Sequence, residues 1–122
     1  MKKAILIISV LFMGATGFAQ NKNAKATIEV DGVCGMCKDR IEKASIQAKG
    51  VKAATWNVDT HELKLIYNEG KTDLIKIQQS IADSGHDTKD IKASDEAYNS
   101  IDDCCRYRDA QVVDDHKSGD HK

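Results

Sequence analysis

The chain of 122 residues contains no proline, and it has neither a long hydrophobic run nor an excess of positive charge. The missing proline argues against thioredoxin-like enzymes, which place a cis-proline against their reactive thiol pair. The longest apolar run, Ala4 to Met13, is shorter than the roughly 20 residues that a membrane-spanning helix needs. The 18 Lys and Arg residues stand against 19 Asp and Glu residues, so the charge does not indicate a nucleic-acid-binding surface.

The N-terminus has the pattern of a secretory signal peptide over residues 1–19. Lys2 and Lys3 precede the apolar run, and the small residues that follow end at Gly17-Phe18-Ala19, a sequence that suits cleavage. No cysteine lies near this position, so lipidation is not expected, and an uncleaved anchor is the alternative. We therefore predict a periplasmic or secreted protein that is not embedded in a membrane after the signal is removed.

Hydrophobic periodicity in the following residues predicts one small domain of strands and helices. The expected elements are a strand at 26–31, a helix at 36–48, strands at 51–58 and 63–67, a helix at 72–83 and a polar edge strand at 86–92. This β-α-β-β-α-β order is typical of a ferredoxin-like α+β sandwich, in which an antiparallel sheet carries two helices on one face.

The four cysteines form two local pairs, Cys34 with Cys37 and Cys104 with Cys105. In an exported protein, four cysteines would ordinarily mean two structural disulfides. A bridge within either pair closes almost no loop and adds little stability, which argues against that interpretation. The Cys34-x-x-Cys37 spacing fits three other chemistries: a redox dithiol, half of a zinc site, or a two-thiolate clamp for a soft metal ion.

The predicted topology brings the Cys34–Cys37 loop, the hairpin at 59–61 and the loop at 84–86 to the same end of the sandwich. Cys34 precedes the first helix and Cys37 lies in its first turn, where the helix dipole favours the thiolate and lowers the thiol pKa. Two thiolates select Cu(I) or Hg(II) over hard cations, and they fall short of the four ligands of structural zinc. His86 lies in the loop at this end and is a candidate third metal contact.

Several motifs together resemble the heavy-metal-associated domain family. They are a strand followed by Gly32, a Cys34-x-x-Cys37 motif that opens a helix, Gly50-Val51 before the second strand, and Gly85 after the second helix. That family includes periplasmic and cytosolic copper chaperones, the mercury-binding periplasmic protein and the N-terminal modules of metal-transporting ATPases. The resemblance covers residues 26–92, and it implies that Cys34 and Cys37 are the metal-binding pair.

The chain departs from the family pattern at two positions. The sequence Gly32-Val33-Cys34 is one residue shorter than the usual motif and lacks its loop methionine. His86 stands where many members have Tyr or Phe, so it enters the set of candidate ligands. Met36, inside the motif, is expected to fill the core.

These observations lead to the prediction of an exported metallochaperone that carries Cu(I) on Cys34 and Cys37. It is expected to pass the ion to a metal-transporting membrane protein or another metal-binding protein, and not to be an enzyme. Hg(II) and Zn(II) are the alternative ions. A mercuric-ion carrier and a thiol-disulfide oxidoreductase that uses the same cysteine pair are the alternative functions.

The residues after the predicted domain change in character. Residues 93–109 predict a short helical extension that docks on the domain and carries Cys104 and Cys105, and residues 110–122 predict a disordered charged tail. The adjacent thiols could form a strained vicinal disulfide, bridge to the first pair, or supply further thiolates to the metal. We expect a separate structural or redox role, and supplementary ligation is the alternative.

Overall fold

The structure, a computed structural model, describes residues 21–118, so the predicted signal peptide at 1–19 lies outside the described residues. The elements are β1 Ala24–Glu29, α1 Gly35–Gln47, β2 Val51–Trp56, β3 Glu62–Tyr67, α2 Leu74–Asp83, α3 Asp95–Asn99, the short 3-10 helix η1 Asp103–Cys105 and α4 Ala110–Ser118. Among the described residues, no helix is long and apolar enough to cross a membrane.

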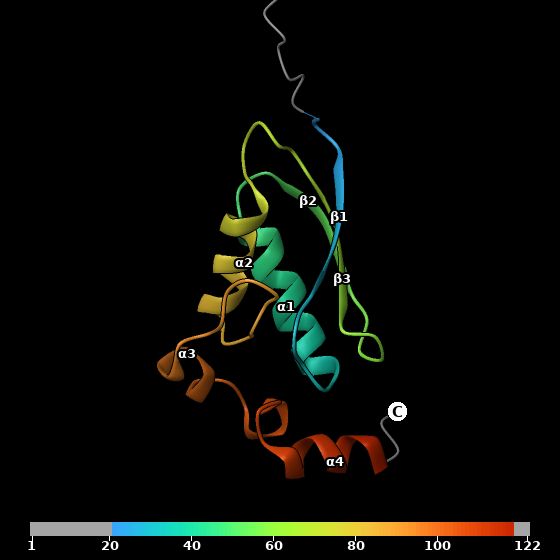
Figure 1. Cartoon of the computed structure of the whole chain (residues 1–122), viewed down its shortest axis with the longest axis vertical. Coiled ribbons are helices and arrows are strands. Elements are labelled where there is room, and N and C mark those ends of the chain that lie inside the picture. Colours follow the sequence, from blue (N-terminus) through green and yellow to red (C-terminus); the bar gives the residue numbers. More distant parts are fainter. Residues whose placement is uncertain (1–20, 119–122) are drawn as a thin grey trace, which may run out of the picture.

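The three strands form an antiparallel sheet in the order β1-β3-β2, and α1 and α2 cover one face of it (Figure 1). Alternating side chains of the strands and the inner stripes of both helices meet in one core, because period-2 and period-3.6 patterns each bury one face. Its fully buried large side chains include Val30, Trp56, Leu63, Leu65, Ile41, Ile77 and Ile81. The predicted α+β ferredoxin-like fold is confirmed.

The edge strand predicted at 86–92 is reduced to a single antiparallel bridge between Thr88 and Val30. Two backbone hydrogen bonds still link the segment to the end of β1: the N–H of Asp31 donates to the carbonyl of Asp87 at 2.9 Å, and the N–H of Lys89 donates to the carbonyl of Glu29 at 3.0 Å. Other backbone groups of the segment are used elsewhere. The N–H of Thr88 donates to the carbonyl of Ile91 at 2.8 Å, and the N–H of Asp90 donates to the side chain of Gln78 at 3.0 Å. Because local turns and a helix side chain satisfy these groups, the segment does not extend a ladder along β1.

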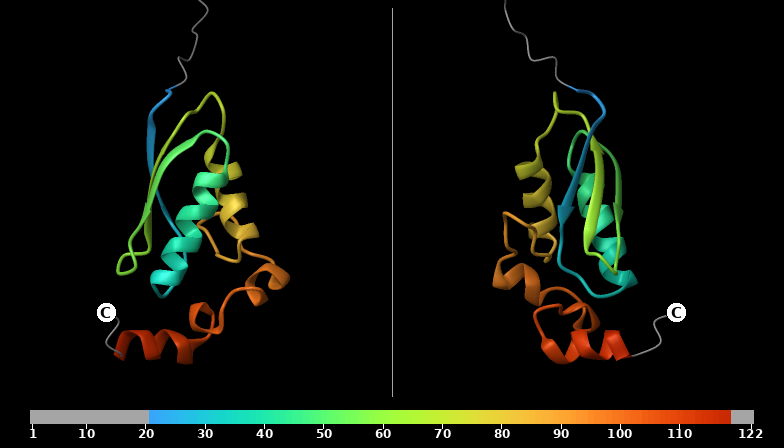
Figure 2. Two further views of the ribbon diagram at one scale, coloured as in Figure 1. Left: turned by 180° about the vertical axis from the view of Figure 1, so that it is seen from behind. Right: turned by 45° about the vertical axis from the view of Figure 1, so that its right-hand side comes forward.

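The C-terminal extension, residues 93–118, crosses the end of the domain at which α1 begins (Figures 1 and 2). Tyr98 and Ile101 of this extension are buried in the same core cluster as the sheet and helices. Gly85, which follows α2, lies in close contact with the extension. Its φ is +109°, and a Cβ atom there would lie 2.5 Å from Cγ2 of Ile101 and 2.8 Å from the carbonyl oxygen of Ala97. A glycine is therefore needed both for the backbone turn and for the packing of the extension.

Polar contacts hold the extension in place. The guanidinium of Arg108 donates to both carboxylate oxygens of Asp87, at 2.7 and 3.2 Å, and to the carbonyl of Ala93 at 2.8 Å. The hydroxyl of Tyr107 donates to the carbonyl of Gly85 at 2.8 Å and accepts from the N–H of Asp87 at 2.8 Å. A bidentate Arg–carboxylate pair has a fixed geometry, so these contacts fix the segment that carries Cys104 and Cys105.

The sequence predicts a disordered tail over 110–122, but the structure has helix α4 over Ala110–Ser118. Asp109 stabilises its first turn, because its carboxylate accepts from the N–H of Gln111 at 2.9 Å and its carbonyl accepts from the N–H of Val113 at 3.1 Å. The side chain of Gln111 also donates to Asp115, one turn further on, at 2.8 Å. Local capping of this kind stabilises a helix even where the composition is polar.

Candidate metal centre

The loop that carries the first two cysteines is shaped by Trp56. The indole is buried and its Nε1 donates to the carbonyl of Val30 at 3.0 Å. A Cβ atom at Gly32 would lie 2.9 Å from Cη2 of this ring, so glycine lets the loop pass directly over it. Cys34 then takes an extended conformation at the N-cap of α1, which places Cys37 in the first turn of the helix.

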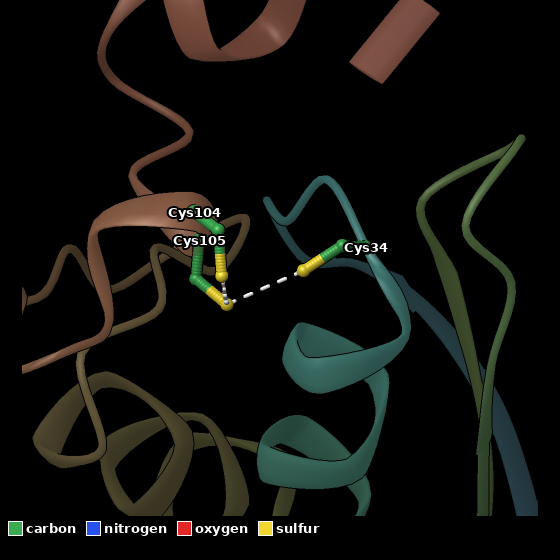
Figure 3. Close-up of side chains that lie close together, drawn as sticks. All are labelled: Cys34, Cys104 and Cys105. Carbon is green, nitrogen blue, oxygen red and sulfur yellow. Dashed lines mark hydrogen bonds between the residues drawn. The ribbon is translucent and has the colours of Figure 1, made fainter. Parts of the chain in front are cut away.

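Four cysteine thiols meet at this end of the domain. The Sγ atom of Cys34 lies 3.4 Å from that of Cys37 and 3.3 Å from that of Cys105. The sulfurs of Cys34, Cys104 and Cys105 lie within 4.8 Å of one another (Figure 3). The structure thus unites the two pairs, and Cys34 is the thiol that joins them.

The thiols differ in their electrostatics. Burial raises the pKa of the Cys34 thiol, but hydrogen bonds from the backbone of Cys37 and from the thiols of Cys105 and Cys37 outweigh it, so the pKa is lowered. Burial raises the pKa of Cys37 and raises that of Cys105 far more strongly. Of these three thiols, Cys34 is therefore the one that ionises first, and an ion that also binds Cys37 and Cys105 must displace their protons.

Arg40, on α1 one turn after Cys37, is a residue that the sequence interpretation missed. A hydrogen bond from its guanidinium to Cys105 lowers the pKa of that thiol and partly offsets the effect of burial. The same guanidinium donates from Nη2 to the carboxylate of Asp102 at 3.0 Å. The spacing of Arg40 from Cys37 put it on the thiol side of the helix, but only the docked extension shows which thiol it contacts.

His86, the predicted third contact, is fully buried and both of its ring nitrogens are already engaged. Nδ1 lies 2.8 Å from the carbonyl oxygen of Asp31, and Nε2 lies 3.3 Å from Nη1 of Arg40. This pattern fits a neutral ring that donates from Nδ1 and accepts at Nε2. The ring also stacks on Tyr107, with centroids 5.4 Å apart. In this arrangement His86 supports the loop and the extension, and Cys105 takes its place as the candidate third contact.

The burial of His86 predicts a loss of stability in mild acid. Burial, together with the charge of Arg40, lowers the pKa of this imidazole to about 4, whereas an unfolded chain titrates near about 6.5. Between these values the unfolded state binds a proton that the folded state does not, so stability falls as the pH falls through this window. We expect His86 by itself to lower the free energy of unfolding by about 2 to 3 kcal/mol between pH 7 and pH 4.5. Asp31 offsets part of this loss, because burial raises the pKa of its carboxyl group.

Urea denaturation of the reduced, metal-free protein at these two pH values measures this effect. His86→Phe should be less stable at pH 7 and should show a smaller loss on acidification, because the titrating ring is gone. Asp87 does not contribute in this window, since Arg108 lowers its pKa below the usual value despite its partial burial. An unchanged pH slope in the variant would contradict the role given to His86.

Met36 does not fill the core as the sequence suggested. Its side chain is 48% exposed, and its Sδ atom lies 3.5 Å from Sγ of Cys104. The extension lies beside the first turn of α1, so the side chain of Met36 contacts the extension and not the core. Trp56 and Tyr67, by contrast, are buried in the core.

An open groove with a volume of about 920 Å³ borders Cys34. It lies between the cysteine loop and the extension, and the residues that line it include His61, Tyr107, Val113 and His116. Cys34 is half-buried, whereas Cys37 and Cys105 are buried. The cluster can therefore be reached from the groove at Cys34.

The part of the chain that carries Cys34 and Cys37 is similar to known proteins. Residues 27–87, half of the chain, match the family model of the heavy-metal-associated domain. The chain is 30% identical over 63 residues to a copper chaperone, CopZ, of Staphylococcus epidermidis, covering 51% of this chain and 93% of that protein. It is 38% identical over 66 residues to a copper-exporting P-type ATPase of Staphylococcus haemolyticus, covering 53% of this chain but only 8% of the ATPase.

Solved structures agree with this match. A CopZ metallochaperone is 27% identical and superposes with a TM-score of 0.51, covering 53% of this chain and 98% of that one. Oxidized MerP from Ralstonia metallidurans superposes with a TM-score of 0.53 at 24% identity, over 55% of this chain and 94% of that one, and this likeness concerns the fold alone. These alignments cover little more than half of the chain.

Proposed function

This chain belongs to the heavy-metal-associated domain family, and from this premise we propose that it binds one soft metal ion, Cu(I), on the inner thiols Cys34, Cys37 and Cys105. The observation that carries the proposal is the position of Cys34, whose sulfur lies 3.4 Å from Cys37 and 3.3 Å from Cys105. Two sulfurs that each lie about 2.3 Å from a shared ion can be at most about 4.6 Å apart. Each of the two pairs can therefore share an ion. The three thiols whose sulfurs all lie within 4.8 Å of one another are Cys34, Cys104 and Cys105, so an ion on the inner thiols requires the sulfurs of Cys37 and Cys105 to move closer together.

The chemistry of the inner thiols favours a soft monovalent ion. Thiolates select Cu(I) over hard cations, and the four thiols of the cluster do not form the closed four-ligand site of structural zinc, because their sulfurs do not all lie within 4.8 Å of one another. Three thiolates around Cu(I) carry an excess of negative charge, and Arg40 lies beside Cys105 to offset part of it. The names of the CopZ relatives support copper as the natural ion.

We propose that the protein works as an exported metallochaperone and not as an enzyme. Cys34 borders the groove and is the least buried of the three inner thiols, so it is the inner thiol that an incoming ligand reaches first. A thiolate of a metal-transporting membrane protein or of another metal-binding protein would bind the ion there, while Cys37 and Cys105 release it in turn. The signal-like pattern of residues 1–19 supports export to the periplasm or secretion.

Native mass spectrometry of the reduced protein tests the choice of ion. Cu(I), Hg(II) and Zn(II) are offered separately, each against a competing thiol buffer. We expect a tight 1:1 complex with Cu(I) and much weaker retention of Zn(II), while Hg(II) measures how far the same thiolates could serve a mercuric-ion carrier. Failure to retain Cu(I) at buffer concentrations that strip Zn(II) would contradict the proposal.

A thiol-disulfide oxidoreductase is the second candidate, and one observation favours it. The more exposed Cys34 has a lowered pKa beside a buried Cys37 with a raised one, which suits a nucleophile and a resolving thiol. The discriminating measurement is turnover of a small disulfide substrate by the metal-free protein. Catalytic turnover that bound Cu(I) abolishes would favour the enzyme, and stoichiometric reaction alone would favour the carrier.

A further inference from the structure

Two more sulfur atoms lie beyond the inner thiols, and the proposed function does not use them. These outer sulfurs are Sγ of Cys104 and Sδ of Met36, which lie 3.5 Å apart. Both side chains are exposed, and they come from η1 and the first turn of α1, 68 residues apart in the sequence. An exposed thiol beside an exposed thioether is an unusual pair for a protein that meets oxidising conditions.

The five sulfurs form a continuous series from the core to the surface. Successive neighbours are 3.4 Å apart for Cys37 and Cys34, 3.3 Å for Cys34 and Cys105, 3.9 Å for Cys105 and Cys104, and 3.5 Å for Cys104 and Met36. Each distance is below the limit of about 4.6 Å for two sulfurs on one ion. A single Cu(I) ion that is bound by the three inner thiolates does not need further ligands, so the sulfurs of Cys104 and Met36 stay unused.

We propose that Cys104 and Met36 form an outer site for a second Cu(I) ion, with the Cys105 thiolate bridging the inner and outer ions. The inference rests on the proposed function, since the bridging thiolate belongs to the inner site. Thiolate and thioether donors together select Cu(I), whereas zinc sites use thiolates, imidazoles and carboxylates. The outer site is thus specific for the ion that the inner site is proposed to hold.

The second ion adds no net charge to the cluster. Its binding forms a bond to each of the three sulfurs, and Cys104 loses its proton to the solvent as the ion arrives. One positive charge enters and one negative charge appears, so the charge that Arg40 offsets does not grow. Neither sulfur nor copper changes its oxidation state in this step.

The structure holds the outer sulfurs in position without the ion. The N–H of Cys105 donates to the carbonyl of Asp102 at 2.8 Å, which sets the turn of η1. Nε2 of His116 on α4 lies 2.7 Å from the carbonyl oxygen of Cys104. Because α4 and η1 fix the backbone at Cys104, ion binding costs little further conformational entropy there.

The test is native mass spectrometry of the reduced protein at a fixed free Cu(I) concentration, set by a Cu(I) chelator. The wild-type chain should take up two ions as a monomer. Cys104→Ser and Met36→Leu should each take up one ion, and the affinity of that ion should stay within about threefold of the wild-type first step. Ile46→Leu is the matched control, because Ile46 lies on the same helix, is also 48% exposed and bears no sulfur; it should still take up two ions.

The outcomes separate this inference from the proposed function. If the wild-type protein binds no Cu(I) against the chelator, the inner site fails and the outer site fails with it. If it binds one ion tightly and no second, or if the second appears only in a dimer, the outer site is wrong while the inner site stands. A tenfold or larger loss of first-ion affinity in Cys104→Ser would also overturn the inference, since Cys104 would then be an inner ligand.

Discussion

Replacing Cys34 by serine is expected to weaken Cu(I) binding at least a thousandfold, a loss of about 4 kcal/mol in binding free energy. Cys34 is the thiol that contacts both Cys37 and Cys105, so its removal separates the remaining inner thiols from their common neighbour. A serine hydroxyl is a hard donor that stays protonated at neutral pH, and it does not replace a thiolate for a soft ion. The fold should survive, because Cys34 is half-buried in a surface loop.

Competition titration with a Cu(I) chelator measures this effect, and Cys104→Ser is the matched control. Both substitutions remove one sulfur from the same cluster, but Cys104 is exposed and its sulfur lies 3.9 Å from that of Cys105, whereas the sulfur of Cys34 lies 3.3 Å from it. The control should keep the tight ion within about threefold. Equal losses in the two variants, or no loss in Cys34→Ser, would mean that the ion is not centred on Cys34.

Gly85→Ala is expected to destabilise the protein by about 2 to 5 kcal/mol. A Cβ atom at this positive-φ position carries a backbone cost of about 1 to 2 kcal/mol. Its contacts of 2.5 Å with Ile101 and 2.8 Å with Ala97 add an overpacking cost of about 1 to 3 kcal/mol. Both contacts belong to the extension, so the strain is relieved if the extension moves away, and Cys105 then leaves the inner thiols.

Urea denaturation measures the loss of stability, and Cu(I) competition measures the state of the site in the same variant. Gly35→Ala is the control, since a Cβ atom there meets nothing within 4 Å and the position has no positive φ. It should be close to neutral in stability. A Gly85→Ala protein with wild-type stability and wild-type Cu(I) affinity would contradict the packing described for the extension.

Local patterns were sufficient to predict the main elements of the domain and the position of Cys34 and Cys37 at the start of α1. The helix predicted at 36–48 is observed at Gly35–Gln47, and the strand predicted at 51–58 is observed at Val51–Trp56. Both elements bury a periodic set of side chains, and such a set is visible in the sequence. The prediction of an edge strand at 86–92 was wrong. The side chain of Gln78 accepts a hydrogen bond from the N–H of Asp90, and no periodicity in the sequence indicates that contact.

The rest of the site depends on contacts between distant segments. Topology correctly brought His86 to the end with the cysteines, but it could not show that its ring would meet the carbonyl of Asp31 and the guanidinium of Arg40. The position of Cys105 is set by the pair of Arg108 with Asp87, which are 21 residues apart. Pairings of this kind follow from the docking of the extension and leave no periodic signal in the sequence.

The contact between Cys34 and Cys105 joins positions 71 residues apart in the chain. An ion held by both thiolates closes this loop as a covalent crosslink would, and a crosslink over such a length removes roughly 4 kcal/mol of chain entropy from the unfolded state. The crosslink is lost whenever the ion is passed on. Delivery of the cargo would then also loosen the tether between the domain and its C-terminal segment, so an emptied carrier is more easily unfolded than a loaded one.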